Sequence, residues 1–255
     1  MKEIIQAKLE QLEKDRNIKI LYAVESGSRA WGFASKDSDY DVRFIYVPDI
    51  THYFDIRNLK DSIEVMDGDL DFAGWELKKT LGLLYKGNPP LLEWLLSPLI
   101  YKEDPEAIPE LRTLSRGYYD AKKAIYHYLH MAEGNYRQYI KDKDQIRVKK
   151  YLYVIRPLLA CNWIMQKGEM APMEINKTLE TIKPLHKAYA EVSKLLELKR
   201  NGAELDLGPT NDILNIFIDH NLGLFYEYAG TLDSKPLDTE LLNKYLFKYT
   251  YAKTK

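Results

Sequence analysis

Two aspartates one residue apart, Asp39 and Asp41, open an apolar segment that runs to Val47. Valine, isoleucine, phenylalanine and tyrosine are frequent in this segment, which is typical of a β-strand. Side chains alternate between the two faces of a strand, so both carboxylates project from the same face. Carboxylates held that close repel each other unless a cation lies between them. Because magnesium prefers oxygen ligands and is usually held by one or two carboxylates with substrate phosphates, the pair indicates a magnesium site.

A second polar stretch, Ser26-Gly27-Ser28, follows an earlier apolar run, Ile18–Val24, which also predicts a strand. Gly27 permits backbone angles that other residues resist, and a short helix is expected over residues 29–33. Backbone N–H groups and a hydroxyl at such a strand-to-helix turn can bind phosphate oxygens. A phosphate-binding turn that is followed closely by a metal-binding pair is what chemistry on a magnesium-bound nucleotide requires.

Together, Gly27-Ser28, Gly32 and Ser38-Asp39-Tyr40-Asp41 resemble the Gly-Ser…Asp-x-Asp signature of the DNA polymerase beta nucleotidyltransferase superfamily. The resemblance implies that the Gly-Ser turn holds the triphosphate of a nucleoside triphosphate. It also implies that the aspartate pair and a third strand carboxylate hold two magnesium ions. The alternative interpretation is a surface turn whose acidic residues only add solubility.

The third carboxylate is expected from a β-hairpin, because Asp67-Gly68 lies between two alternating segments, 62–66 and 69–73. Asp69 and Asp71 share one face of the second strand, and both are candidates. We prefer Asp71, because its place between two apolar residues resembles the third motif of the superfamily. The alternative is that both are solvated charges of the hairpin. The predicted catalytic and metal-binding residues are therefore Asp39, Asp41 and Asp71.

Arg43 shares the strand face of Asp39 and Asp41. Its guanidinium group could orient a carboxylate or bind a phosphate of the nucleotide. A buried salt bridge is the competing interpretation.

Basic and aromatic side chains recur between residues 147 and 163. On a helix Lys149, Tyr153 and Arg156 lie along one face with Lys150 beside them, which suits a triphosphate and a nucleobase. An arginine this deep in an apolar run needs an anionic partner, either a phosphate or a protein carboxylate. A similar Lys-Lys-Tyr…Tyr-x-x-Arg-Pro-Leu-Leu segment occurs in a predicted bacterial nucleotidyltransferase branch associated with an RNA repair pathway. The expected nucleotide-binding residues are Gly27, Ser28, Ser38, Arg43, Lys149, Lys150, Tyr153 and Arg156.

Composition narrows the remaining possibilities for this chain of 255 residues. The net charge of −1 excludes a strongly cationic surface overall but allows a local basic patch. A single cysteine, Cys161, excludes an internal disulfide framework and favours a reducing compartment. The first residues are amphipathic rather than a signal peptide, and no apolar run is long enough to span a membrane. We expect a cytoplasmic protein without a membrane partner; the sequence indicates no particular oligomeric state.

The order of the predicted elements indicates an α+β fold. A small mixed-sheet, palm-like nucleotidyltransferase domain is expected over residues 1–105, beginning with a helix over residues 3–15. Beyond Pro105 and Pro109 strand-like alternation gives way to helical periodicity. An all-helical domain that binds nucleotide or acceptor is therefore expected over residues 106–255, with helices at 110–141, 144–167, 174–200, 211–228 and 238–250.

The expected reaction is transfer of a nucleoside monophosphate from a nucleoside triphosphate to an acceptor hydroxyl, with release of pyrophosphate. The resemblance implies magnesium as the cofactor and favours RNA as the acceptor. A small molecule of the aminoglycoside type or a protein hydroxyl are alternative acceptors. A catalytically inactive nucleotide-binding sensor is a further alternative. The presence of the carboxylates and the Gly-Ser turn argues against it.

Overall fold

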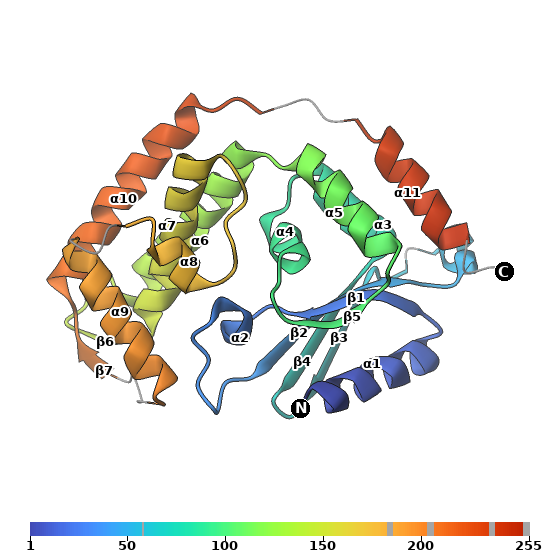
Figure 1. Cartoon of the computed structure of the whole chain (residues 1–255), viewed down its shortest axis with the longest axis horizontal. Coiled ribbons are helices and arrows are strands. Elements are labelled where there is room, and N and C mark those ends of the chain that lie inside the picture. The colour runs from blue at the N-terminus through green and yellow to red at the C-terminus, as the bar shows by residue number, and fades with distance from the viewer. Residues whose placement is uncertain (58, 183–185, 203–206, 235–237, 252–255) are drawn as a thin grey trace. The chain divides into compact units, whose positions relative to one another are not determined.

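The computed structural model describes residues 1–255 except 58, 183–185, 203–206, 235–237 and 252–255 (Figure 1). The chain divides into two compact units. The first, which we call the sheet unit, comprises Met1–Ala30, Asp39–Tyr119 and Pro236–Lys255. The second, the helical unit, comprises Trp31–Ser38 and Asp120–Lys235. Each unit therefore combines segments that are distant in the sequence.

The sheet unit is built on a five-stranded mixed sheet with the order β3-β4-β2-β1-β5. Its strands are β1 (Lys19–Glu25), β2 (Tyr40–Val47), β3 (Ser62–Asp67), β4 (Leu70–Glu76) and β5 (Ile100–Glu103). The central pair β2 and β4 is parallel, and the other three pairs are antiparallel. The predicted hairpin is confirmed, with Gly68 at φ +58° in its turn. The α+β class with a mixed sheet is thus the observed fold.

Helix α1 (Lys2–Arg16) covers one face of the sheet (Figure 1). Its residues Ile5 and Leu9 are fully buried in a core that includes Val42, Phe44 and Phe72 from the central strands. Because side chains alternate along a strand, the neighbouring residues of β2 and β4 project from the opposite face. Burial of apolar side chains against α1 therefore determines which face the charged residues of these strands occupy.

The other elements of the sheet unit are α2 (Ser28–Trp31), a 3₁₀ turn (Ile50–Phe54), α3 (Leu77–Tyr85), α4 (Pro89–Leu95), α5 (Ala107–Tyr118) and α11 (Glu240–Tyr251). The last residue of α2, Trp31, belongs to the helical unit. The units do not coincide with a division at residue 105. Arg112 of α5 binds Glu103 of β5 through two hydrogen bonds of 2.6 and 2.8 Å, and Tyr245 of α11 donates to the carbonyl of Ala107 at 2.8 Å. The first contact ties α5 to the sheet, and the second ties α11 to α5 across 138 residues of sequence.

The helical unit contains α6 (Ala121–Tyr139), α7 (Lys150–Lys167), α8 (Ile175–Leu179), α9 (Lys187–Arg200) and α10 (Asp212–Thr231). A short antiparallel pair, β6 (Gln145–Arg147) and β7 (Leu207–Pro209), interrupts the helices, so the helix predicted to begin at residue 144 begins at Lys150. The helical segment predicted over residues 110–141 is two helices, because α5 ends at Tyr118, and α6 then continues through Gly134. None of the described helices is both long enough and apolar enough to cross a membrane.

Gly74 of β4 makes the closest backbone approach to a core side chain of the sheet. A Cβ at this position would lie 2.1 Å from Cε2 of Phe44. We expect Gly74→Ala to lower the free energy of unfolding by about 1–3 kcal/mol, because the buried ring has to move. Gly82→Ala in α3, where a Cβ meets nothing within 4 Å, is the matched control and is expected to be neutral or stabilising. Equal denaturant midpoints for the two variants would contradict this expectation.

Candidate functional site

Of the three predicted catalytic aspartates, Asp41 and Asp71 lie on the central parallel strands, on the face away from α1. Asp41 and Asp71 are register partners across β2 and β4. Asp39 is exposed and directly precedes β2, and its carbonyl accepts a hydrogen bond from Nε of Arg29 at 3.2 Å. Parallel pairing thus brings together two carboxylates that are 30 residues apart in the sequence.

Arg43 joins Asp41 and Asp71. Its Nη2 lies 3.1 Å from Oδ1 of Asp41 and 2.8 Å from Oδ2 of Asp71. Its Nη1 donates to the backbone carbonyl of Asp71 at 2.9 Å. The guanidinium group therefore supplies the positive charge that two neighbouring carboxylates require. Arg43 thus forms ion pairs with both carboxylates, a contact that fits both the predicted carboxylate-orienting role and the alternative salt-bridge interpretation.

Asp69 was the other candidate for the third carboxylate, and its position differs from that of Asp71. Asp69 lies just before β4 and is exposed. Its backbone carbonyl accepts a hydrogen bond from the N–H of Tyr40 at 2.8 Å. Asp71, in contrast, shares a guanidinium partner with Asp41. The geometry thus places Asp71, rather than Asp69, beside Asp41.

The carboxyl group of Asp41 lies in an environment that disfavours its charge. Burial raises the pKa of Asp41, the neighbouring Arg43 lowers it, and the charges of Asp71 and Asp39 raise it further. The net result is a pKa above the ordinary value. An additional cation beside these carboxylates would relieve both the desolvation and the mutual repulsion.

Gly27 provides the space that the Asp41 side chain occupies. A Cβ at residue 27 would lie 1.6 Å from Oδ2 of Asp41, which is far inside contact distance. The N–H of Ser26 also donates to the backbone carbonyl of Asp41 at 2.9 Å. Residues 26 and 27 of the turn are therefore packed against Asp41.

Glu25 is a buried carboxylate that the sequence analysis did not single out. It is fully buried at the end of β1, accepts the backbone N–H of Asp41 at 2.8 Å and accepts the hydroxyl of Tyr101 at 2.6 Å. Burial raises its pKa, while these hydrogen bonds and one from the backbone of Gly27 lower it. Glu25 holds the backbone of Asp41 in place. In the sequence, Glu25 could have been identified as the single charged residue at the end of an otherwise apolar strand segment.

The predicted nucleotide-binding residues Tyr153 and Arg156 lie in the helical unit, around Trp31. The guanidinium carbon of Arg156 lies 4.3 Å from the centroid of the Trp31 ring, and Tyr153 meets this ring edge-on at 6.2 Å. Arg156 is 6% exposed, whereas Tyr153 is 38% exposed. Tyr153 therefore presents more surface to a ligand, and Arg156 is bound against Trp31.

Lys149, Lys150 and Ser38 also belong to the helical unit. The charge of Lys149 and burial both lower the pKa of Lys199, so these two lysines are neighbours. Lys199 donates to the hydroxyl of Ser35 at 3.2 Å, and the Ser35 and Ser38 hydroxyls lie 3.1 Å apart. Ser38 thus helps to close the loop that contains Ser35. Nζ of Lys150 lies 3.8 Å from the centroid of the Tyr139 ring and 5.2 Å from that of Tyr153, so the predicted neighbours Lys150 and Tyr153 do meet.

A magnesium ion in the sheet unit would need oxygen ligands from side chains that lie close together. In the part of the chain that the structure describes, no group of three or more His, Cys, Asp or Glu side chains is arranged to hold a metal ion. The guanidinium group of Arg43 contacts both Asp41 and Asp71. Their carboxylate oxygens are the kind of donor that a hard divalent cation binds, and such a cation would compete with Arg43 for them.

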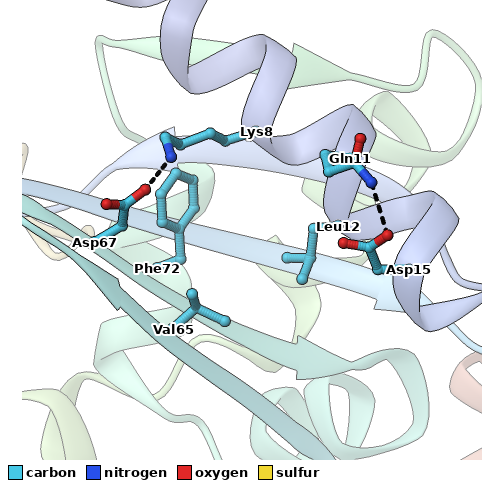
Figure 2. A pocket seen from close by; sticks show the side chains of 7 residues that line it. All are labelled: Lys8, Gln11, Leu12, Asp15, Val65, Asp67 and Phe72. Carbon is cyan, nitrogen blue, oxygen red and sulfur yellow. Dashed lines mark hydrogen bonds and ion pairs between the residues drawn. The ribbon is translucent and has the colours of Figure 1, made fainter.

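A cavity of about 170 Å³ lies on the opposite face of the sheet, between α1 and the β3–β4 hairpin. Figure 2 shows Val65, Phe72 and Leu12 at its base, with Lys8 paired to Asp67 at one side. Phe72 follows Asp71 in β4 and so points away from it. This cavity is therefore separate from the carboxylates.

Three comparisons with known proteins relate this chain to others. A family model described as the RNA repair pathway DNA polymerase beta family matches residues 1–248. An uncharacterized protein of Bacillus subtilis, YcgL, is 44% identical over 248 residues, which cover 96% of this chain and 95% of that protein. A crystal structure of a nucleotidyltransferase-like protein from Exiguobacterium sibiricum aligns over 97% of this chain and 80% of that one, with 11% identity and a TM-score of 0.37.

Proposed function

This chain belongs to the RNA repair pathway DNA polymerase beta family, and on this basis we propose that it is a magnesium-dependent nucleotidyltransferase. In the proposed reaction an acceptor hydroxyl attacks the α-phosphorus of a nucleoside triphosphate. A bond forms between the acceptor oxygen and this phosphorus, and the bond to the oxygen that bridges the α- and β-phosphates breaks. The acceptor loses its proton, and pyrophosphate leaves.

The observation that carries this proposal is the contact between the two halves of the motif. Asp41 lies in register with Asp71 and against the Cβ-free surface of Gly27. Carboxylates for a metal and a turn suited to phosphate are thus adjacent in the sheet unit. A surface turn with acidic residues that only add solubility would not require Arg43, Glu25 and Gly27 to fit around Asp41.

Asp39, Asp41 and Asp71 would hold the magnesium ions in this proposal. Bound magnesium would neutralise phosphate charge and stabilise the entering and leaving oxygens. Arg43 would then contact a phosphate or remain with Asp71, since its partners are the oxygens that magnesium prefers. Glu25 would keep the Asp41 backbone aligned without contacting the substrate.

The nucleotide would contact Gly27 and Ser28 through its phosphates, because this turn offers backbone N–H groups and a hydroxyl. For the helical unit we retain Lys149, Lys150 and Tyr153 as proposed nucleotide contacts, supported by charge and by the exposure of Tyr153. Ser38 and Arg156, which are engaged with Ser35 and Trp31, would act by positioning these neighbours. RNA is the proposed acceptor, in keeping with the description of the family.

The experiment is a pyrophosphate-release assay with each nucleoside triphosphate and magnesium, in the presence of RNA, DNA or an aminoglycoside. We expect release that depends on both magnesium and RNA and that stops on addition of a chelator. Release with an aminoglycoside alone would instead assign a small-molecule acceptor. Nucleotide binding without release under any condition would assign a nucleotide sensor and contradict the proposal.

A further inference from the structure

A cavity of about 350 Å³ lies in the helical unit, where the chain passes from α6 through β6 into α7. It is lined by Tyr139, Lys143, Gln145, Ile146, Arg147, Lys150 and Leu207. Asp39, Asp41 and Asp71 do not line it, whereas Lys150, one of the nucleotide contacts proposed above, does.

The lining of this cavity carries three positive charges, from Lys143, Arg147 and Lys150. No acidic residue is among the described lining residues, and none of the three cations has an ion pair within the described part of the chain. Lys143 donates to the neutral carbonyl of Gln138, and its sequence neighbours Asp142 and Asp144 are not among the lining residues. Since the whole chain has a net charge of −1, this is a local concentration of positive charge. Like charges this close favour a bound anion.

The same cavity also offers aromatic and apolar surface. Nζ of Lys150 lies 3.8 Å from the centroid of the Tyr139 ring, and Leu207 is 74% exposed at the cavity. Two exposed cations, Lys143 and Arg147, in one cavity with an aromatic ring and an apolar side chain match the two parts of a nucleic-acid strand. The phosphates meet the cations, while sugars and bases meet the rings and apolar groups.

We propose that this cavity binds the phosphodiester backbone of a single-stranded nucleic acid, which is the RNA acceptor if the proposed function holds. Lys143 and Arg147 would contact successive phosphates, since both are exposed and come from different segments of the cavity wall. Lys150 would hold Tyr139 in place for the strand. A triphosphate is less well matched, because the lining has no glycine turn like the one at Gly27 and includes the exposed Leu207.

The test is fluorescence anisotropy of the full chain with a labelled 15-nucleotide oligouridylate, without magnesium, over a series of salt concentrations. We expect Arg147→Glu and Lys143→Glu each to weaken binding at least about 10-fold and Arg147→Ala to reduce the log–log salt slope by about 0.7–1. Lys187→Glu is the matched control. It makes the same charge change at an exposed lysine of the same unit, outside the cavity, and should leave affinity within about twofold.

Results of several kinds would overturn the inference. One is unchanged affinity in Arg147→Glu, or an equal loss in Lys187→Glu, since either would remove the cavity from the binding site. Another is efficient displacement of the oligonucleotide by magnesium-free ATP, which would assign the cavity to a nucleotide. An oligodeoxyuridylate of equal length should bind with similar affinity, because backbone phosphates do not distinguish the sugars; a strong preference for one sugar would contradict backbone recognition.

The proposed function is judged separately, by pyrophosphate release. An enzyme that binds RNA through Arg147 but releases no pyrophosphate with any acceptor would leave this inference standing without the proposed function. RNA-dependent pyrophosphate release that is unaffected in Arg147→Glu would support the proposed function and contradict this inference.

Discussion

Replacing Asp41 by asparagine is expected to lower RNA-dependent pyrophosphate release by at least about 1,000-fold. The substitution removes one of the charges that would hold magnesium, while the amide oxygen can still accept a hydrogen bond from Arg43. The backbone contact of residue 41 with Glu25 is also retained. Turnover is therefore lost through the carboxylate charge and not through misfolding. Steady-state rates at saturating magnesium measure the effect.

The matched control is Asp69→Asn. Asp69 has the same charge and lies two residues before Asp71, but it is exposed, and its backbone carbonyl accepts a hydrogen bond from the N–H of Tyr40. We expect its activity to stay within about twofold of wild type, as is usual for an exposed charge without a buried partner. Full activity in Asp41→Asn, or an equal loss in Asp69→Asn, would show that the carboxylates are wrongly assigned.

The pH dependence of stability gives a second readout for Asp41→Asn. Because the pKa of Asp41 is raised in the folded protein, its ionised form is disfavoured there relative to the unfolded chain. The stability linked to this group is present below the unfolded-state pKa and is lost as the pH rises through the folded-state pKa. The asparagine variant should therefore unfold at or above the wild-type temperature at pH 7. This difference should shrink as the pH falls below about 4.

Gly27→Ala is expected to lower turnover by about 100-fold or more, because a Cβ would lie 1.6 Å from Oδ2 of Asp41. The carboxylate has to move away from the turn, which separates the proposed metal and phosphate contacts. The crowding should also cost about 1–3 kcal/mol of folding free energy. Initial rates and denaturant unfolding, measured on the same preparation, separate the two effects.

Gly82→Ala tests whether added bulk alone accounts for the result. Residue 82 lies in α3 of the same unit with no atom within 4 Å of the added Cβ, so activity should be unchanged. Gly74→Ala provides a second comparison, since it strains the sheet against Phe44 without touching Asp41. If Gly27→Ala retained wild-type turnover, the close packing of this glycine against Asp41 would have no bearing on the site.

Local sequence patterns were sufficient for the elements that carry the motif. Alternation around Asp41 predicted its strand, the Asp67-Gly68 pair predicted the hairpin, and the composition of 18–24 predicted the first strand. These predictions succeed because strand periodicity and turn chemistry act over a few residues. The same local reasoning failed at residues 144–149, where pairing with the distant β7 replaced the expected helix.

The sequence by itself determined the family of this protein, the class of its fold and the residues available for chemistry. Only the tertiary structure decided which of these residues meet. Asp71 was distinguished from Asp69 by parallel pairing, and Glu25 became part of the site because its buried side chain reaches the backbone of Asp41. The segment 31–38, between the two halves of the motif, belongs to the helical unit through Arg156 and Lys199, more than 100 residues away. Contacts at such separation depend on how whole elements pack, which no local pattern records.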